Sequence, residues 1–223
     1  MALTLRHSEL RIQANKIWLD AYLCIAPDVR GLIVYAVPHL PRLREARESH
    51  FCTVLEEAGF GTLMLNLLTS YEEQRDADTQ YDIALLSQRL EAVGEWIANQ
   101  PTLFELRLGM IANGTVAASA IRLAGRNPEL FAALISKAGR IDLAGAAPLR
   151  QLHTPIFVLT PGAETELLAS TTRAYELIGG PKTMLNVAQA SAGFIEPGSL
   201  DAAAQASTQW FAGHMPPRET SAS

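Results

Sequence analysis

Histidine, cysteine and one cluster of acidic residues are the side chains of this chain whose chemistry could serve a function. His39 lies between Pro38 and Pro41 after an apolar run. It could act as a base or bind a ligand there, and an exposed loop histidine is the simpler interpretation. His50 and Cys52 suggest a thiol–imidazole pair. Residues two apart on a helix do not face each other, so we expect Cys52 to be a core residue instead.

Metal and phosphate motifs are missing from the sequence. No HxH, HExxH or CxxC spacing occurs, and the acidic segment 72–78 lacks the glycine and the alternating ligands of a calcium loop. Gly109 and Gly114 do not have the spacing of a dinucleotide fingerprint, and no lysine follows them as in a phosphate loop. We therefore expect neither a metal site nor a cofactor.

Composition limits the class of protein and its partners. Hydrophobic residues make up 48% of the 223 residues and charged residues 18%, which is typical of a folded protein and not of disorder. The net charge of −5, without clusters of Lys or Arg, argues against nucleic acid or an anionic membrane as partner. No leader and no apolar run of about 20 residues is visible, so we expect a cytoplasmic protein.

The chain alternates short β-rich runs with longer helical stretches, as in a mostly parallel sheet that is covered on both faces. Leu10–Ala14 and Trp18–Ile25 are too close for a helical crossover and predict an antiparallel hairpin. A polar segment, Thr69–Thr79, is predicted to connect a strand to a long helix. Further predicted strands are Gly31–Val37, Thr62–Leu68, Leu106–Ala112, Ala132–Ser136, Pro155–Thr160 and Lys182–Val187, and the helices are Arg42–Glu57, Tyr81–Asn99, Thr115–Ala124, Glu166–Ile178 and Leu200–Ala212.

These elements predict a single α/β domain over residues 1–214, with a sheet of about eight strands, followed by a short polar tail over residues 215–223. The order of two edge strands and regular strand–helix alternation resembles the α/β-hydrolase fold, and within it the small dienelactone hydrolase-like family, which has no lid domain. The phrases that support the resemblance are Glu57–Leu63, Leu67–Thr69, Tyr81–Ile83, Gly139–Ala144, Gly180–Lys182 and Glu196–Leu200.

The resemblance implies a catalytic triad, and the residues at its positions are not the expected ones. The family places a serine in a G-x-S-x-G turn between a strand and a helix. Here the turn is Ala112–Val116, with Gly114 at the nucleophile position. Ala192 stands where the histidine is expected, and Glu164 stands where the acid is expected. Without a histidine to orient, we expect Glu164 to cap the next helix or to interact by its charge with the N-terminus of that helix. We expect Thr115, at a helix start, to cap its helix or to face solvent.

The loop after the third strand also departs from the family, which tends to place His-Gly there. This chain has Val37-Pro38, and proline has no backbone N–H to offer an oxyanion. In the best-studied case, loss of the nucleophile or the base alone lowers kcat roughly a millionfold. The sequence therefore predicts a pseudo-hydrolase that does not hydrolyse by a triad.

Two functions remain open at this point. The first is a non-catalytic protein that binds a protein partner or a small ligand, for example as accessory subunit of a complex. The second is an enzyme with a rebuilt site, using His39, Asn113, Thr115 and Glu164 on the same fold. A homo-oligomer is compatible with both. The residues that could line a residual pocket are Val37, Pro38, His39, Asn113, Gly114, Thr115, Glu164 and Ala192.

Overall fold

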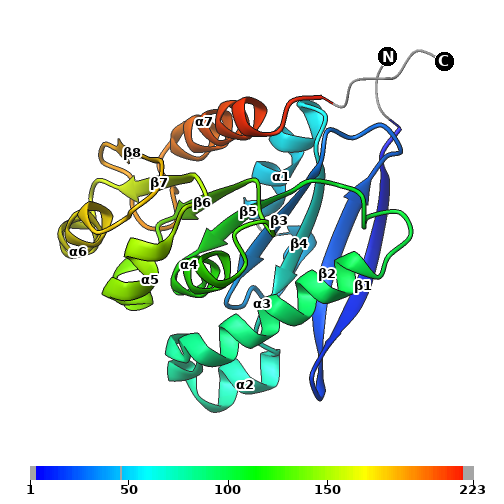
Figure 1. Ribbon diagram of the computed structural model, residues 1–223, viewed down its shortest axis with the longest axis horizontal. Helices are drawn as coiled ribbons and strands as arrows, with labels where there is room; N and C mark the ends of the chain where they lie inside the picture. Colours follow the sequence, from blue (N-terminus) through cyan, green and yellow to red (C-terminus); the bar gives the residue numbers. More distant parts are fainter. Residues whose placement is uncertain (1–3, 46, 218–223) are drawn as a thin grey trace.

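The structure, a computed structural model, describes residues 4–45 and 47–217. One eight-stranded sheet runs through it in the order β1-β2-β4-β3-β5-β6-β7-β8, which confirms the predicted sheet (Figure 1). The strands are β1 Arg6–Ala14, β2 Ile17–Ile25, β3 Leu32–Val37, β4 Gly61–Asn66, β5 Leu108–Asn113, β6 Ala133–Lys137, β7 Ile156–Pro161 and β8 Lys182–Val187.

The two edge strands at the N-terminal side form the predicted hairpin. β1 and β2 are antiparallel and are joined by Asn15 and Lys16 alone. Asn15 has a φ of 56°, the left-handed conformation that a tight hairpin turn requires and that Asn tolerates. β2 then pairs antiparallel with β4, and the other neighbouring strands are parallel. The carboxyl ends of β3 to β8 therefore lie along one edge of the sheet.

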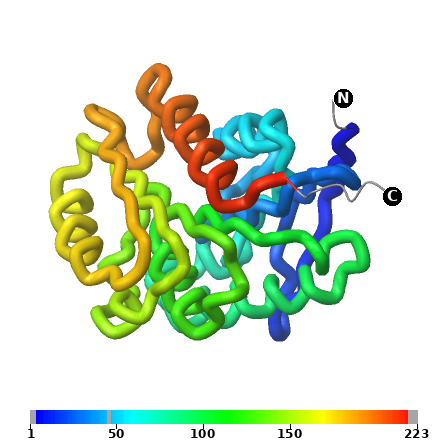
Figure 2. The backbone as a smooth tube through the Cα atoms, turned by 45° about the horizontal axis from the view of Figure 1, so that its top comes forward, coloured from blue at the N-terminus to red at the C-terminus, as the bar shows by residue number. Residues whose placement is uncertain are grey.

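Helices cover both faces of the sheet (Figure 2). The hydrophobic cluster on one face packs α1 and α7 against the strands, and the larger cluster on the other face packs α3, α4, α5 and α6. The α-helices are α1 Arg47–Glu57, α2 Ser70–Arg75, α3 Ile83–Ala98, α4 Val116–Arg126, α5 Ala146–Gln151, α6 Thr165–Glu176 and α7 Ser199–His214, and the 3₁₀ turns are η1 Leu43–Glu45, η2 Ala77–Tyr81 and η3 Ile141–Ala144.

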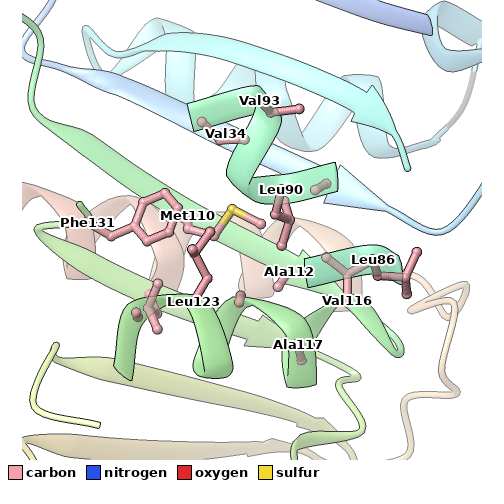
Figure 3. Close-up of a cluster of buried hydrophobic side chains, with 14 of the residues drawn as sticks. Val34, Leu86, Leu90, Val93, Met110, Ala112, Val116, Ala117, Leu123 and Phe131 are labelled. Carbon is pink, nitrogen blue, oxygen red and sulfur yellow. The ribbon is translucent and has the colours of Figure 1, made fainter. Parts of the chain in front are cut away.

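The larger cluster holds β5 and α4 in place. Its side chains from α3, α4 and the central strands interlock under the turn between β5 and α4 (Figure 3). Burial of each Leu or Val side chain contributes about 1.5–3 kcal/mol to stability. The predicted apolar stripe of α3 is confirmed as buried and consists of Ile83, Leu86, Leu90, Val93 and Ile97.

The start of α3 provides a direct test of local structure. Asp82 precedes the helix, and its Oδ1 accepts the backbone N–H of Leu85 at 2.9 Å. Substitution Asp82→Ala removes this cap, so we expect the free energy of unfolding to fall by about 1 kcal/mol in urea titration. The control Asp82→Ser keeps an acceptor and should lose much less. Equal losses in both variants would contradict the capping role.

The polar segment Thr69–Thr79 connects β4 to α3 as predicted, and it contains α2 and the start of η2, which the sequence did not predict. Thr69 and Glu72 make a reciprocal capping box, in which each side chain accepts the other's backbone N–H. Glu72 also pairs with Arg89, which is buried and whose Nη1 donates to the carbonyl of Leu67 at 2.6 Å. Burial alone would raise the pKa of Glu72, but the hydrogen bonds from Arg89 and Thr69 outweigh it and lower the pKa.

The predicted polar tail is wrong at its first residue. Met215 is fully buried in the smaller hydrophobic cluster. Its side chain lies against Gly31, where a Cβ would overlap with the Met215 Cε atom. The absence of a side chain on Gly31 thus lets the end of α7 dock on the sheet, and the tail prediction for 218–223 lies outside the described residues.

Candidate functional site

The turn between β5 and α4 is the centre of the candidate site. Gly114 connects the strand to the helix with a φ of 59°, a conformation that glycine adopts without the steric cost of a Cβ. Its N–H donates to the carbonyl of Lys137 at 3.3 Å, and its carbonyl accepts the N–H of Arg140 at 3.0 Å. These bonds fix a sharp strand–turn–helix whose apex has no side chain.

Open space lies over Gly114. A Cβ built on it would meet within 4 Å only Pro38 Cγ, at 3.9 Å. The carbonyl of Val37 accepts the N–H of Leu67 at 3.0 Å, and the carbonyl of Pro38 accepts the N–H of Leu68 at 2.8 Å. The loop after β3 therefore faces the turn with a proline ring, and Pro38 has no N–H to donate.

Glu164 and Ala192 are brought together. The backbone N–H of Ala192 donates to Glu164 Oε1 at 3.2 Å, and the N–H of Ala163 donates to the carbonyl of Ala190 at 2.9 Å. Attraction of the Glu164 charge to the N-terminus of α6 stays a prediction. Glu164 precedes α6, but its side chain makes no capping hydrogen bond, so the prediction of a side-chain cap is wrong. The reason is that its carboxylate is used by the loop after β8 instead.

Thr115 is not the exposed or capping residue that the sequence predicted. It lies at the start of α4, is 4% exposed and makes no side-chain cap. Its hydroxyl has no hydrogen-bond partner among the described residues. One turn later, Ser119 donates to the carbonyl of Ile83 at 3.2 Å. This face of α4 is therefore directed to the start of α3, which explains why Thr115 is covered.

His39 is more enclosed than an exposed loop histidine, and that interpretation is wrong. Its side chain is 7% exposed, with Nδ1 at 3.3 Å from the carbonyl oxygen of Leu68 and Nε2 at 3.9 Å from Glu73 Oε2. Asn66 holds the same loop, because its side chain accepts the N–H of Leu40 at 2.8 Å and donates to the carbonyl of Leu40 at 2.9 Å. His39 is thus fixed by the segment that leads into α2.

The four residues of the rebuilt-site hypothesis are not bonded to one another. Within residues 4–45 and 47–217, no hydrogen bond or ion pair joins any two of His39, Asn113, Thr115 and Glu164. Val37, one of the residues predicted to line a pocket, is 1% exposed, and it belongs with Phe194, which is 0% exposed, to the smaller hydrophobic cluster.

The loop that carries Ala192 is held by charged side chains. Arg47 donates to the carbonyl of Gly193 at 3.2 Å and to that of Phe194 at 2.8 Å. The N–H of Ser191 donates to Glu196 at 3.0 Å, and this bond is the main cause of the lowered pKa of that carboxyl. Phe194 has a φ of 50°, which is unusual for a residue with a side chain. The position of Ala192 is therefore well determined by its neighbours.

Lys137 is the feature near the turn that sequence analysis missed. It ends β6, is fully buried, and its Nζ lies 4.8 Å from the centre of the Phe194 ring. The nearest carboxylate oxygen, Glu48 Oε1, is 3.9 Å from Nζ, and Nζ has no hydrogen-bond partner among the described residues. Desolvation lowers the pKa of Lys137 to about 8, with a contribution from Arg47, whereas Glu48 opposes the shift. A lysine closing an apolar strand was the signal in the sequence.

A groove in the structure lies at a different place from the predicted pocket. A groove of about 950 Å³ runs between the hairpin and the loop after β3. None of the eight residues predicted to line a pocket contributes to it. Its lining residues are Glu9, Leu10, Arg11, Asp20, Ala21, Tyr22, Leu40, Pro41, Arg42, Leu43, Arg44 and Asn66.

Three further properties concern the described part of the chain. No group of three or more His, Cys, Asp or Glu side chains converges there as metal ligands would. No helix in the same part is both long and apolar enough to cross a membrane. Cys24 and Cys52 are free and buried, as predicted for core thiols.

Comparison with known sequences gives one kind of relative. No protein-family model matches the chain. Proteins of two strains of Mycobacterium tuberculosis, each named "Putative phosphoribosyl transferase", are 32% identical over 212 residues. The match covers 95% of this chain and 47% of each relative. The chain thus spans about half the length of the curated relatives it matches.

Several solved structures have the same architecture as this chain. Dienelactone hydrolase from Anabaena variabilis ATCC 29413 superposes with a TM-score of 0.87 and 28% identity, over 95% of this chain and 99% of that chain. Est1E from Butyrivibrio proteoclasticus gives a TM-score of 0.74 at 11% identity, over 92% and 98% of the two chains. A dienelactone hydrolase-like promiscuous phosphotriesterase from metagenomic libraries gives 0.73 at 12%, over 94% and 98%. The chain therefore has the α/β-hydrolase fold and is similar in structure to dienelactone hydrolases.

Proposed function

We propose that this chain is a non-hydrolytic relative of the dienelactone hydrolases, which acts by binding a small ligand or a protein partner. The observation that supports it most directly is Gly114. The residue at the apex of the strand–turn–helix has the positive φ of such a turn and no nucleophilic side chain. Ala192, beside the Glu164 carboxylate, offers no base. The acid is in place and has nothing to orient.

The surroundings of the turn support the same proposal. Pro38 removes one N–H from the loop that faces Gly114, and Val37 and Phe194 are packed in the core rather than lining an open channel. His39 is bound to the segment after β4 and not to a nucleophile. These are the features expected if the scaffold was kept and its hydrolytic centre was lost.

The name of the mycobacterial relatives refers to transfer of a phosphoribosyl group, and we propose no such activity for this chain. The chain matches 47% of each relative, and that part by itself accounts for an α/β-hydrolase fold over 99% of the Anabaena structure. We propose that the transferase activity implied by the name resides in the remainder of those relatives.

The first test asks whether the chain has an activated serine. We expect the purified chain to show no labelling by a fluorophosphonate probe and no release of p-nitrophenol from short-chain p-nitrophenyl esters above the buffer rate, because no hydroxyl is paired with a base at the turn. Mass spectrometry of the intact protein measures the adduct. Stoichiometric labelling of any serine or threonine at this edge of the sheet would refute the proposal, and heat-denatured protein gives the background.

A rebuilt active site is the second candidate, favoured by the enclosed His39 beside the exposed Glu73, whose Nε2 and Oε2 atoms are 3.9 Å apart. A carboxylate beside a histidine is the arrangement of a general base. If this pair is catalytic, any ester turnover found should fall about 100-fold in His39→Gln. Turnover that survives this substitution would leave the pair with a structural role only.

The binding role can be measured without knowing the ligand. Chain purified natively from its source and analysed by mass spectrometry should contain a stoichiometric small molecule or protein. For a small molecule at the turn, Gly114→Leu should abolish retention because a side chain would fill the space beside Pro38. The control Gly213→Leu, at a position with open space in α7, should retain it. Retention by both variants would place the ligand elsewhere.

A further inference from the structure

The outer edge of β1 is not paired with another strand of the described residues. β1 is the first strand in the sheet order and pairs only with β2 among the described residues (Figure 1). It is nine residues long, and most of its side chains are exposed. An edge strand of this length presents a row of N–H and C=O groups that can pair with another strand.

The hairpin fixes which residues direct their backbone groups outward. Ala14 is paired with Ile17 across the two-residue turn, so its backbone groups point to β2. Because hydrogen-bonded and non-hydrogen-bonded pairs alternate along an antiparallel ladder, every second residue of β1 points the other way. The residues whose N–H and C=O face the outer edge are His7, Glu9, Arg11 and Gln13, and all four are exposed.

The charges on this edge are complementary to themselves in one register. If two copies of β1 pair antiparallel about a two-fold axis at Leu10, Glu9 of each copy lies opposite Arg11 of the second copy. Leu10 is also the midpoint of Arg6–Ala14, so all nine residues overlap. An axis at Glu9 or at Arg11 would instead place two like charges opposite each other and shorten the overlap.

In this register the outward backbone groups can also form hydrogen bonds, and the apolar side chains on the other face of β1 can pack together. The opposed pair of Glu9 and Arg11 consists of outward-facing residues, so both can hydrogen-bond across the axis. On the face toward α3, Leu10 meets Leu10 of the second copy, and Leu10 already packs against the larger core cluster. Opposite-charge and apolar cross-strand pairs each contribute about 0.2–1 kcal/mol, in addition to the main-chain hydrogen bonds.

The two charged side chains are oriented before any association. Arg11 Nε lies 3.2 Å from Asp20 Oδ1, and Arg44 Nη1 lies 3.0 Å from Glu9 Oε1, both pairs exposed. They hold the side chains on one face of the hairpin, beside the groove of about 950 Å³. Charges on an edge strand usually prevent association. Here Glu9 and Arg11 have opposite charges and lie opposite each other when two copies pair. A second copy of this chain is therefore attracted to this edge rather than repelled.

We propose that two copies of this chain associate through β1, antiparallel and centred on Leu10, into one continuous sheet. The proposal does not depend on what the turn at Gly114 does. Sedimentation velocity should give a species of about twice 24.2 kDa for the wild-type chain. The variants Glu9→Arg and Arg11→Glu each place like charges opposite, and the dissociation constant should rise roughly 10- to 30-fold.

Mixing distinguishes this register from a general charge effect. Glu9→Arg carries two arginines at these positions and Arg11→Glu carries two glutamates, so the two variants should form a heterodimer when mixed. The double variant E9R/R11E restores complementarity and should dimerise like the wild type. The control Arg6→Glu reverses a charge of β1 that lies opposite Ala14, and it should leave the dimer intact.

Each result decides the proposal. A wild-type chain that stays monomeric at high concentration overturns it. A dimer that persists in both single variants, or a double variant that is as monomeric as the singles, also overturns it. Hydrogen exchange provides the second measurement, because the amides of Glu9 and Arg11 should gain protection with concentration while the amide of Ser8, bonded within the hairpin, should not change.

Discussion

Replacing Gly114 by serine and Ala192 by histidine together is expected to create an esterase that neither single substitution produces. Serine restores a hydroxyl at the apex of the turn, where a Cβ meets only Pro38 Cγ at 3.9 Å. Histidine at position 192 is introduced beside Glu164, whose Oε1 already accepts the Ala192 N–H at 3.2 Å. The double variant should therefore regain the chemical order of nucleophile, base and acid.

The expected rate of p-nitrophenyl acetate hydrolysis is about 100-fold above that of either single variant, since a positioned base contributes at least that much. The N–H that follows residue 114 remains available to an oxyanion, although Pro38 withholds the second one. Serine at a positive φ costs about 1–2 kcal/mol of stability, which urea titration measures separately from activity.

The matched control is G114A/A192H, which has the same backbone strain and the same histidine but no nucleophile. It should be inactive and unlabelled by fluorophosphonate. If G114S/A192H folds and still shows neither labelling nor turnover, the turn at Gly114 is not a former nucleophile position, and the proposed descent from a triad hydrolase is wrong. Activity in the control would assign the hydrolysis to histidine alone.

Lys137→Met is expected to raise the free energy of unfolding by on the order of 3 kcal/mol at pH 7. Burial lowers the pKa of Lys137 to about 8, and each unit below its ordinary value corresponds to about 1.4 kcal/mol. Methionine has a similar length and no charge to desolvate. The long separation of 3.9 Å from Glu48 does not offset the burial of the ammonium group.

The gain depends on pH in a defined direction. Between about pH 8 and about pH 10.4 the unfolded chain holds a proton on Lys137 that the folded chain does not, so wild-type stability from this group rises with pH. The advantage of Lys137→Met should be complete below about pH 8 and vanish by about pH 10.4. The buried thiols, whose pKa values are raised by burial, act in both proteins and cancel in the difference.

The measurement is urea unfolding of both proteins at several pH values. Lys16→Met, which removes a solvated lysine in the hairpin turn, serves as control and should change little at any pH. A second variant, K137M/E48Q, removes the carboxylate that loses its partner. Lower stability of both Lys137 variants at pH 7 would mean that the buried charge is itself stabilising.

The sequence by itself determined the architecture and the composition of the turn. Alternating apolar runs and helical stripes fix a parallel sheet with two covered faces, because each strand and helix must bury its apolar side. Ile83 and Leu90 of α3 are buried as their spacing requires. The resemblance to the dienelactone hydrolase-like family, followed along the order of strands, indicated Gly114, Glu164 and Ala192 as the positions of a triad. That Glu164 accepts a hydrogen bond from the backbone of Ala192 required the structure.

Only the tertiary structure decided which polar side chains are enclosed and by what. Lys137 is one residue among apolar neighbours in the sequence, and its contact with Phe194 joins residues from two distant segments. Thr115 was expected to cap its helix or to face solvent and His39 to lie in an exposed loop, and both side chains are enclosed, His39 by the segment that leads into α2. The pattern of apolar residues in one segment predicts which face of a helix or strand is buried. Burial of a particular polar side chain depends instead on which other element packs over it. Which element packs there depends on the fold of the whole chain, so the sequence pattern of one segment does not predict it.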